Sequence, residues 1–131
     1  MQSLTALLVA CAACASSPHT PPQPPAPKQI ALDRHGDVRA LAELATRTRG
    51  NCDALASELR PLVARMKVHL TEIHRAQLDP ARARQLTTEL HAYDATDGGL
   101  DEQIGSDLAQ TYLGCKQNRA LLDLIDQIPA E

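Results

Sequence analysis

Apolar residues recur at steps of three and four across the middle of the chain, and this spacing limits the fold more than any other feature. The residues are Cys52, Leu55, Leu59, Leu62, Met66, Leu70 and Ile73. Such spacing places them on one face of an amphipathic helix, which must pack against other elements to bury that face. Pro61 lies within the stripe, where it would either kink the helix or begin a second helical segment.

Shorter segments on both sides show the same helical spacing. One begins at Asp37 and stops at Gly50-Asn51, and others follow Asp79-Pro80, Gly98-Gly99 and Asn118. Asp79 and Asn118 are expected to be N-caps, and Pro80 suits the first position of a helix. The apolar positions of these segments are Val38, Leu41, Ala42, Leu44 and Ala45; Leu86, Leu90 and Tyr93; Ile104, Leu108, Tyr112 and Cys115; and Leu121, Leu124, Ile125 and Ile128.

The apolar residues also exclude a sheet. No stretch alternates with a period of two, and Ala and Leu supply most of the apolar content, with no Phe or Trp. Sheets favour β-branched and aromatic residues, whereas Ala and Leu suit closely packed helices. The sequence therefore predicts an all-α fold, a small antiparallel bundle of three to five helices.

The N-terminal residues predict export. Residues 4–13 form an uncharged apolar stretch that is too short for a permanent transmembrane helix but has the length of a signal-peptide core. Within it, Leu8-Val9-Ala10-Cys11 resembles the bacterial lipobox, where signal peptidase II cleaves before a cysteine that carries a diacylglycerol thioether. The resemblance implies that residues 1–10 are a lipoprotein signal peptide and that Cys11 is acylated, with palmitate as a typical acyl chain.

Two alternatives to this cleavage remain open. Cys14 offers a second lipidation point, and Ala13-Cys14-Ala15 is a small-x-small site at which signal peptidase I would release a soluble periplasmic protein. Ala12 would follow the acylated cysteine, and it is not the aspartate that signals retention in the inner membrane. We therefore expect an outer-membrane lipoprotein that faces the periplasm or the cell surface.

A proline-rich segment separates this N-terminus from the helices. Residues 16–28 contain six prolines, which exclude helix and favour a disordered, extended tether with polyproline II character. Fully extended, the tether would span roughly 40 Å. The expected organisation is a signal peptide at 1–10, an acylated cysteine and tether at 11–29, and a helical bundle at 30–131. A docking peptide for an aromatic-lined groove or a cell-wall polymer is the alternative interpretation of the prolines.

The four cysteines divide between the N-terminus and the bundle. Export places the bundle in an oxidising compartment, and Cys52 and Cys115 lie on or beside the apolar faces of different helices. We predict a disulfide between them. A redox-active pair is the alternative, although the two residues lack C-x-x-C spacing. Cys14 has no partner if Cys11 is acylated.

Metal-ligating residues do not converge in the sequence. His35 precedes the first expected helix, His69 and His74 fall on opposite margins of the long apolar face, and His91 points away from its stripe. Met66 and His69, at i and i+3, are weak candidates for copper or haem iron. The acidic segment around Gly98-Gly99 superficially resembles a calcium loop but departs from its spacing; its acids are Asp94, Asp97, Asp101 and Glu102. We expect no cofactor.

The net charge and the motif content bear on two classes of function, nucleic-acid binding and catalysis. The formal net charge is −3 with both signs interspersed, which gives no basic patch for nucleic acid. No catalytic motif is present, and we expect a protein that is not an enzyme.

The layout resembles short bacterial lipoproteins of unknown function that join a proline-rich tether to a two-cysteine helical module. The matching features are Leu8-Val9-Ala10-Cys11, residues 51–56 from Asn51-Cys52 onward, Asp79-Pro80, and Cys115 followed by residues 118–122. We expect a lipid-anchored interaction or structural module of the cell envelope, with an unidentified envelope protein or polymer as partner. A periplasmic haem- or metal-binding bundle is the alternative.

Overall fold

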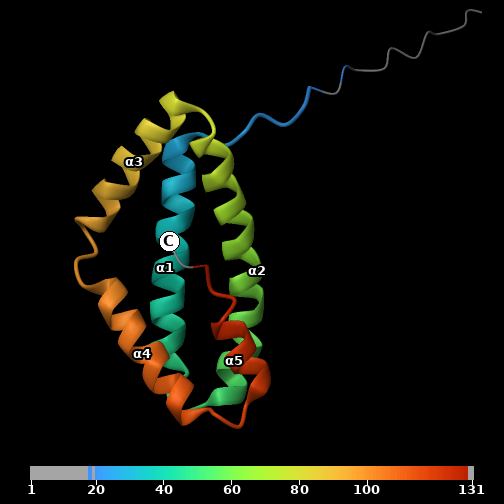
Figure 1. Ribbon diagram of the computed structural model, residues 1–131, viewed down its shortest axis with the longest axis vertical. Helices are drawn as coiled ribbons and strands as arrows, with labels where there is room; N and C mark the ends of the chain where they lie inside the picture. The colour runs from blue at the N-terminus through green and yellow to red at the C-terminus, as the bar shows by residue number, and fades with distance from the viewer. Residues whose placement is uncertain (1–17, 19, 130–131) are drawn as a thin grey trace, which may run out of the picture.

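The computed structural model describes residue 18 and residues 20–129, and these form a bundle of helices (Figure 1). Over this part of the chain there are five helices and no strand, so the predicted all-α fold is confirmed. The helices are α1 (Pro27–Arg47), α2 (Cys52–Gln77), α3 (Pro80–Asp94), α4 (Leu100–Gly114) and α5 (Arg119–Ile125). Within the same residues, no helix combines the length and apolar character needed to cross a membrane. Cys11, Cys14 and His19 lie outside the described residues.

α1 is the central helix of the bundle. It runs antiparallel to α2 and also contacts α3 and α4 (Figure 1). α3 and α4 follow one another along one side of α1, so together they form one interrupted wall, and α5 packs on α2. The bundle thus consists of α1, of α2 with α5, and of the α3–α4 wall, which is interrupted between its two helices.

Polar side chains cap the N-termini of three helices, and two of these caps, Asp79 and Asn118, were predicted. The Oδ1 atom of Asn51 accepts a hydrogen bond from the backbone N–H of Ala54, and Asn118 accepts one from Leu121. Asp79 accepts from the N–H groups of the second and third residues of α3. These acceptors satisfy donors that have no partner inside a helix, so the N-caps predicted at Asp79 and Asn118 are confirmed.

The first helix begins earlier than predicted. α1 starts at Pro27, ten residues before Asp37 and three before the expected start of the bundle at Ile30. The expectation that the prolines exclude helix as far as Lys28 is wrong for the last two residues. Proline is well suited to the first position of a helix, because its missing N–H would have no partner there. Residues 20–26 carry no helix or strand.

One of the two alternatives for Pro61 is overturned, and the expectation for Tyr112 needs correction. Pro61 lies inside α2, which runs unbroken from Cys52 to Gln77, so the proline does not begin a second segment. Tyr112 was expected on the inner face of α4 but is 40% exposed. At a hundred degrees per residue it lies about 80° around the helix from buried Ile104, at the margin of the packed face.

The buried apolar residues form two clusters along the bundle. The larger joins the second half of α1 to α2, α4 and α5, and the smaller joins the start of α1 to the end of α2 and to α3. The members of the larger cluster are Leu41, Leu44, Leu55, Leu59, Leu62, Val63, Met66, Ile104, Cys115, Leu121 and Leu124. Those of the smaller are Ile30, Ala31, Ile73, Ala76 and Leu86.

A polar group lies between the two clusters. Asp37 is only 1% exposed, and its position on α1 falls between Ala31 of the smaller cluster and Leu41 of the larger. Its carboxylate accepts a hydrogen bond from Arg65 Nε at 2.8 Å and lies 2.6 Å from His69 Nδ1, both on α2. This carboxylate therefore holds α1 and α2 in one register at the level where apolar packing is interrupted.

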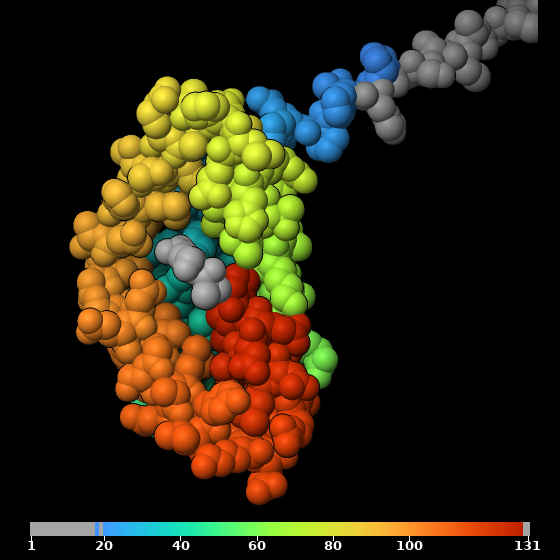
Figure 2. All heavy atoms as spheres, in the orientation of Figure 1, coloured from blue at the N-terminus to red at the C-terminus, as the bar shows by residue number. Residues whose placement is uncertain are grey.

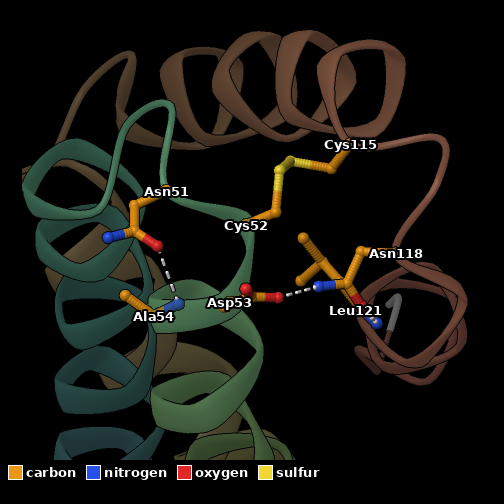
Figure 3. The surroundings of a disulfide bond; sticks show 7 residues. All are labelled: Asn51, Cys52, Asp53, Ala54, Cys115, Asn118 and Leu121. Carbon is orange, nitrogen blue, oxygen red and sulfur yellow. Dashed lines mark hydrogen bonds between the residues drawn. A yellow bond between two sulfur atoms is a disulfide. The ribbon is translucent and has the colours of Figure 1, made fainter.

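A disulfide joins Cys52 to Cys115, as predicted (Figure 3). Cys52 is the first residue of α2, and Cys115 directly follows α4. Close by, Asn118 Nδ2 donates a hydrogen bond to Asp53 at 2.9 Å. The start of α2 is thus fixed both covalently and by a hydrogen bond to the turn that leads into α5.

Candidate functional site

The space-filling view shows a hollow between the α3–α4 wall and α2 with α5, and α1 is visible in its depth (Figure 2). Two pockets make up the candidate site, and the first has a volume of about 320 Å³. α1 contributes Arg34 and His35 to it, α3 contributes its last two turns, and the 95–99 connection with the start of α4 closes one side. The pocket forms because the chain breaks between α3 and α4 instead of continuing as one straight helix against α1.

Gly99 sets the geometry of this break. Its φ of 82° lies in the left-handed region, which side chains with a Cβ adopt only with strain. It precedes α4 directly, and the backbone N–H of Leu100 donates to the carbonyl of Asp97. The turn therefore places the first residues of α4 beside the end of α3.

Three side chains hold the connection against α1. His35 Nδ1 lies 2.6 Å from Asp97 Oδ2, and both side chains are largely buried. The imidazole also stacks on the Tyr93 ring with a centroid distance of 4.6 Å. The carboxylate and the ring together fix the orientation of the imidazole. The Asp97 carboxylate is thus paired with His35, and this pair holds the 95–99 connection against α1.

Other carboxylates remain exposed at the rim of the pocket. Asp94 is the last residue of α3, and Asp101 and Glu102 lie in the first turn of α4. Among the described residues, none of these three forms an ion pair. Carboxylates in the first turn of α4 are favoured by the helix dipole, but one at the end of α3 is not. Asp94 therefore adds negative charge to the rim at some expense in helix stability.

The second pocket, of about 310 Å³, adjoins the first and is more apolar. Arg34 and Leu90 line both of them. The remaining wall of the second pocket comes from one face of α2 and from Pro129; the α2 residues are Met66, Leu70, Ile73, His74 and Gln77. We call the two adjoining pockets the α1 cleft. One half of the cleft is acidic at its rim, and the other half is aliphatic.

The two residues predicted as metal candidates, Met66 and His69, lie in different environments. Met66 is 3% exposed and belongs to the larger core cluster, whereas His69 is half-buried and its Nδ1 faces Asp37. Within residues 18 and 20–129, no group of three or more His, Cys, Asp or Glu side chains could hold a metal ion. The acidic segment that superficially resembled a calcium loop instead lines the first pocket, with Asp97 bonded to His35.

The contacts of two residues, His35 and Asp37, were not predicted from the sequence. His35 was placed before the first helix, but it lies inside α1 and meets a residue 62 positions further along the chain. His91 is exposed, as predicted from its position away from the apolar stripe of α3. His74, which was placed at the margin of the long apolar face, is exposed as well. The signal for Asp37 was present in the sequence, because it stands seven residues after Ile30 and four before Leu41, at an apolar position of the α1 repeat.

No protein-family model, curated protein or solved structure matches this chain. The resemblance to short lipoproteins therefore rests on the sequence motifs alone.

Proposed function

We propose that this protein is a lipid-anchored binding module of the bacterial cell envelope, and that it acts by binding instead of by catalysis. Its α1 cleft would hold part of a partner, while Cys11 would carry the lipid and the proline-rich segment would space the bundle from the membrane. The cleft is the observation that carries the proposal. Its pockets, of about 320 and 310 Å³, adjoin on one face and combine aliphatic with charged side chains, as ligand sites in proteins commonly do.

The rigidity of the scaffold supports a binding role. The cleft lies among α1, α2 and the α3–α4 wall, and α2 is tied to the end of α4 by the Cys52–Cys115 disulfide. The His35–Asp97 contact holds the α3–α4 connection on α1. A preformed cleft loses little conformational freedom when it binds, which favours affinity for a small contact area.

The N-terminal part of the proposal rests on the resemblance of residues 8–11 to a lipobox. We expect full-length protein produced in a Gram-negative bacterium to incorporate an alkyne-tagged fatty acid, and Cys11→Ser to abolish the label. Cys14→Ser is the matched control and should retain it. Labelling lost only in Cys14→Ser would assign the lipid to Cys14 instead of Cys11. An unlabelled mature chain beginning at Ser16 would refute lipidation.

The binding part is tested in the same cells with a photo-crosslinking amino acid. Thr87 is exposed and lines the cleft, whereas Arg60 is exposed on α2 and does not line either pocket. We expect a discrete cross-linked product from position 87 and none from position 60. Equal products from both positions, or none from either, would contradict a partner at the cleft. Metal analysis and an absorption spectrum of the purified protein test the haem- or metal-carrier alternative.

A further inference from the structure

The two halves of the α1 cleft differ in chemistry, and they meet at shared residues. Leu90 and Arg34 line both pockets, so a ligand that fills one pocket reaches the edge of the other. On the α2 side the lining is aliphatic, with Met66, Leu70 and Ile73. The two halves therefore form one continuous cleft with an apolar end and an acidic end.

The acidic end carries more negative than positive charge. Asp94, Asp101 and Glu102 are exposed at its rim, and Asp97 is paired with His35. Arg34 is the cationic side chain that lines this pocket apart from the histidines. A cationic group placed here would meet three carboxylates, whereas a phosphate or carboxylate group would be repelled.

We infer that the α1 cleft binds an extended segment of a partner protein in which aliphatic side chains stand next to lysine or arginine. This inference rests on the proposed function and names the partner's chemistry. The aliphatic side chains would lie against Leu70, Ile73 and Leu90, and the basic side chains would lie against the carboxylates of the rim. A tetrapeptide extends to about 14 Å at most, which suits two adjoining pockets of this size.

The test measures binding of labelled peptides to the purified full-length protein by fluorescence anisotropy. The probe is acetyl-Leu-Leu-Arg-Arg-amide, and its matched forms replace both arginines with glutamine, both arginines with glutamate, or both leucines with glycine. We expect saturable binding of the probe. Because each exposed charge pair contributes only modestly, the glutamine form should bind about fivefold more weakly. The glycine form should bind about tenfold more weakly, because apolar burial is lost, and the glutamate form should not bind.

Variants of the protein assign these effects to the cleft. Asp94→Asn with Asp101→Asn should weaken binding of the arginine probe about fivefold and leave the glutamine form unchanged. Leu70→Ala should weaken the leucine probes and leave the glycine form unchanged. The control for charge is Glu43→Gln with Asp123→Asn, which removes two exposed acids outside both pockets. Circular dichroism establishes that each variant is folded.

Three results would overturn the inference: no binding of the arginine probe, equal binding of the arginine and glutamate forms, or losses that are the same in the cleft variants and in the control. Failure of the proposed function is a separate result. It would be seen as absent lipid label and absent cross-linking from position 87 in cells, while the peptide selectivity of the purified protein remained. A cross-link from position 87 without that selectivity would refute only the partner chemistry.

Discussion

Replacing Asp37 with alanine tests whether the polar group between the two core clusters stabilises the bundle. The carboxylate is 1% exposed and receives two contacts from α2, from Arg65 at 2.8 Å and from His69 at 2.6 Å. Hydrogen bonds to a charged group each contribute about 1.5–3 kcal/mol when they are buried. The upper sum would be about 6 kcal/mol.

The exposure of the partners lowers that figure. The side chain of Arg65 is 52% exposed and that of His69 is 21% exposed, so both can turn to water when the carboxylate is gone. The penalty of a stranded buried charge, which makes removal of one partner from a fully buried pair so costly, is therefore small here. We expect Asp37→Ala to lower the free energy of unfolding by about 3 kcal/mol, which corresponds to a fall in Tm of about 15 °C for a bundle of this size.

Urea unfolding followed by far-ultraviolet circular dichroism measures this change. Asp37→Asn keeps the shape and one acceptor oxygen, so its effect should be about half as large. In a double-mutant cycle, Asp37→Ala and Arg65→Ala should be clearly less than additive, because they remove the same contact.

An exposed ion pair supplies the matched control. Glu58 is bonded to Arg47, and that hydrogen bond holds the pKa of the Glu58 carboxyl below its usual value. Glu58→Gln should nevertheless leave the urea midpoint nearly unchanged, since water solvates both groups when they separate. The reasoning would be refuted if Asp37→Ala were as mild as Glu58→Gln, or if the two mutations of the cycle were fully additive.

The other predictions concern covalent and backbone features. Cys52→Ala with Cys115→Ala should lower stability by about 4 kcal/mol, because the bond closes a loop across a sequence separation of 63, yet keep most helical signal at low temperature; identical melting of the oxidised and reduced proteins would contradict this. Gly99→Ala should cost about 1–2 kcal/mol because of its φ of 82°, whereas Gly98→Ala, whose added Cβ meets nothing within 4 Å, should cost little; equal Tm values for the two variants would be the opposing result. Asp79→Ala should cost about 1 kcal/mol through loss of the α3 cap, and an unchanged urea midpoint would show that the cap is dispensable.

Features of the helices that depend on residues close together in the sequence, such as the N-caps of α3 and α5, could be predicted. Asp79 and Asn118 cap helices because the Oδ1 atom of these short side chains can reach backbone N–H groups of the first helical turn. The Cys52–Cys115 bond was also predictable, because the apolar faces that carry the two residues had to pack together. The start of α1 was missed, since Gly36 and Asp37 interrupt its apolar pattern.

The cleft itself could not be predicted from such signals. It depends on His35 meeting Asp97 and stacking on Tyr93, and these residues belong to α1, to the 95–99 connection and to α3. Helical periodicity states which face of each helix is apolar, but not how two helices are rotated against a third. The acidic segment around Gly98-Gly99 stands out in the sequence, but its place at the rim of a pocket depends on how α3 and α4 pack on α1.

The covalent loop has a mechanical consequence, because it leaves the central helix outside. The disulfide encloses residues 52–115, which include α2, α3 and α4, while α1 precedes the loop and continues directly into the proline-rich segment (Figure 1). Tension transmitted along that segment would therefore load α1 lengthwise against its neighbours. Pro25 would share this load, since Arg82 of α3 donates a hydrogen bond to its carbonyl oxygen. A strong pull would draw α1 out by shear, while α2, α3 and α4 would stay joined in the covalent ring, against which α1 could pack again.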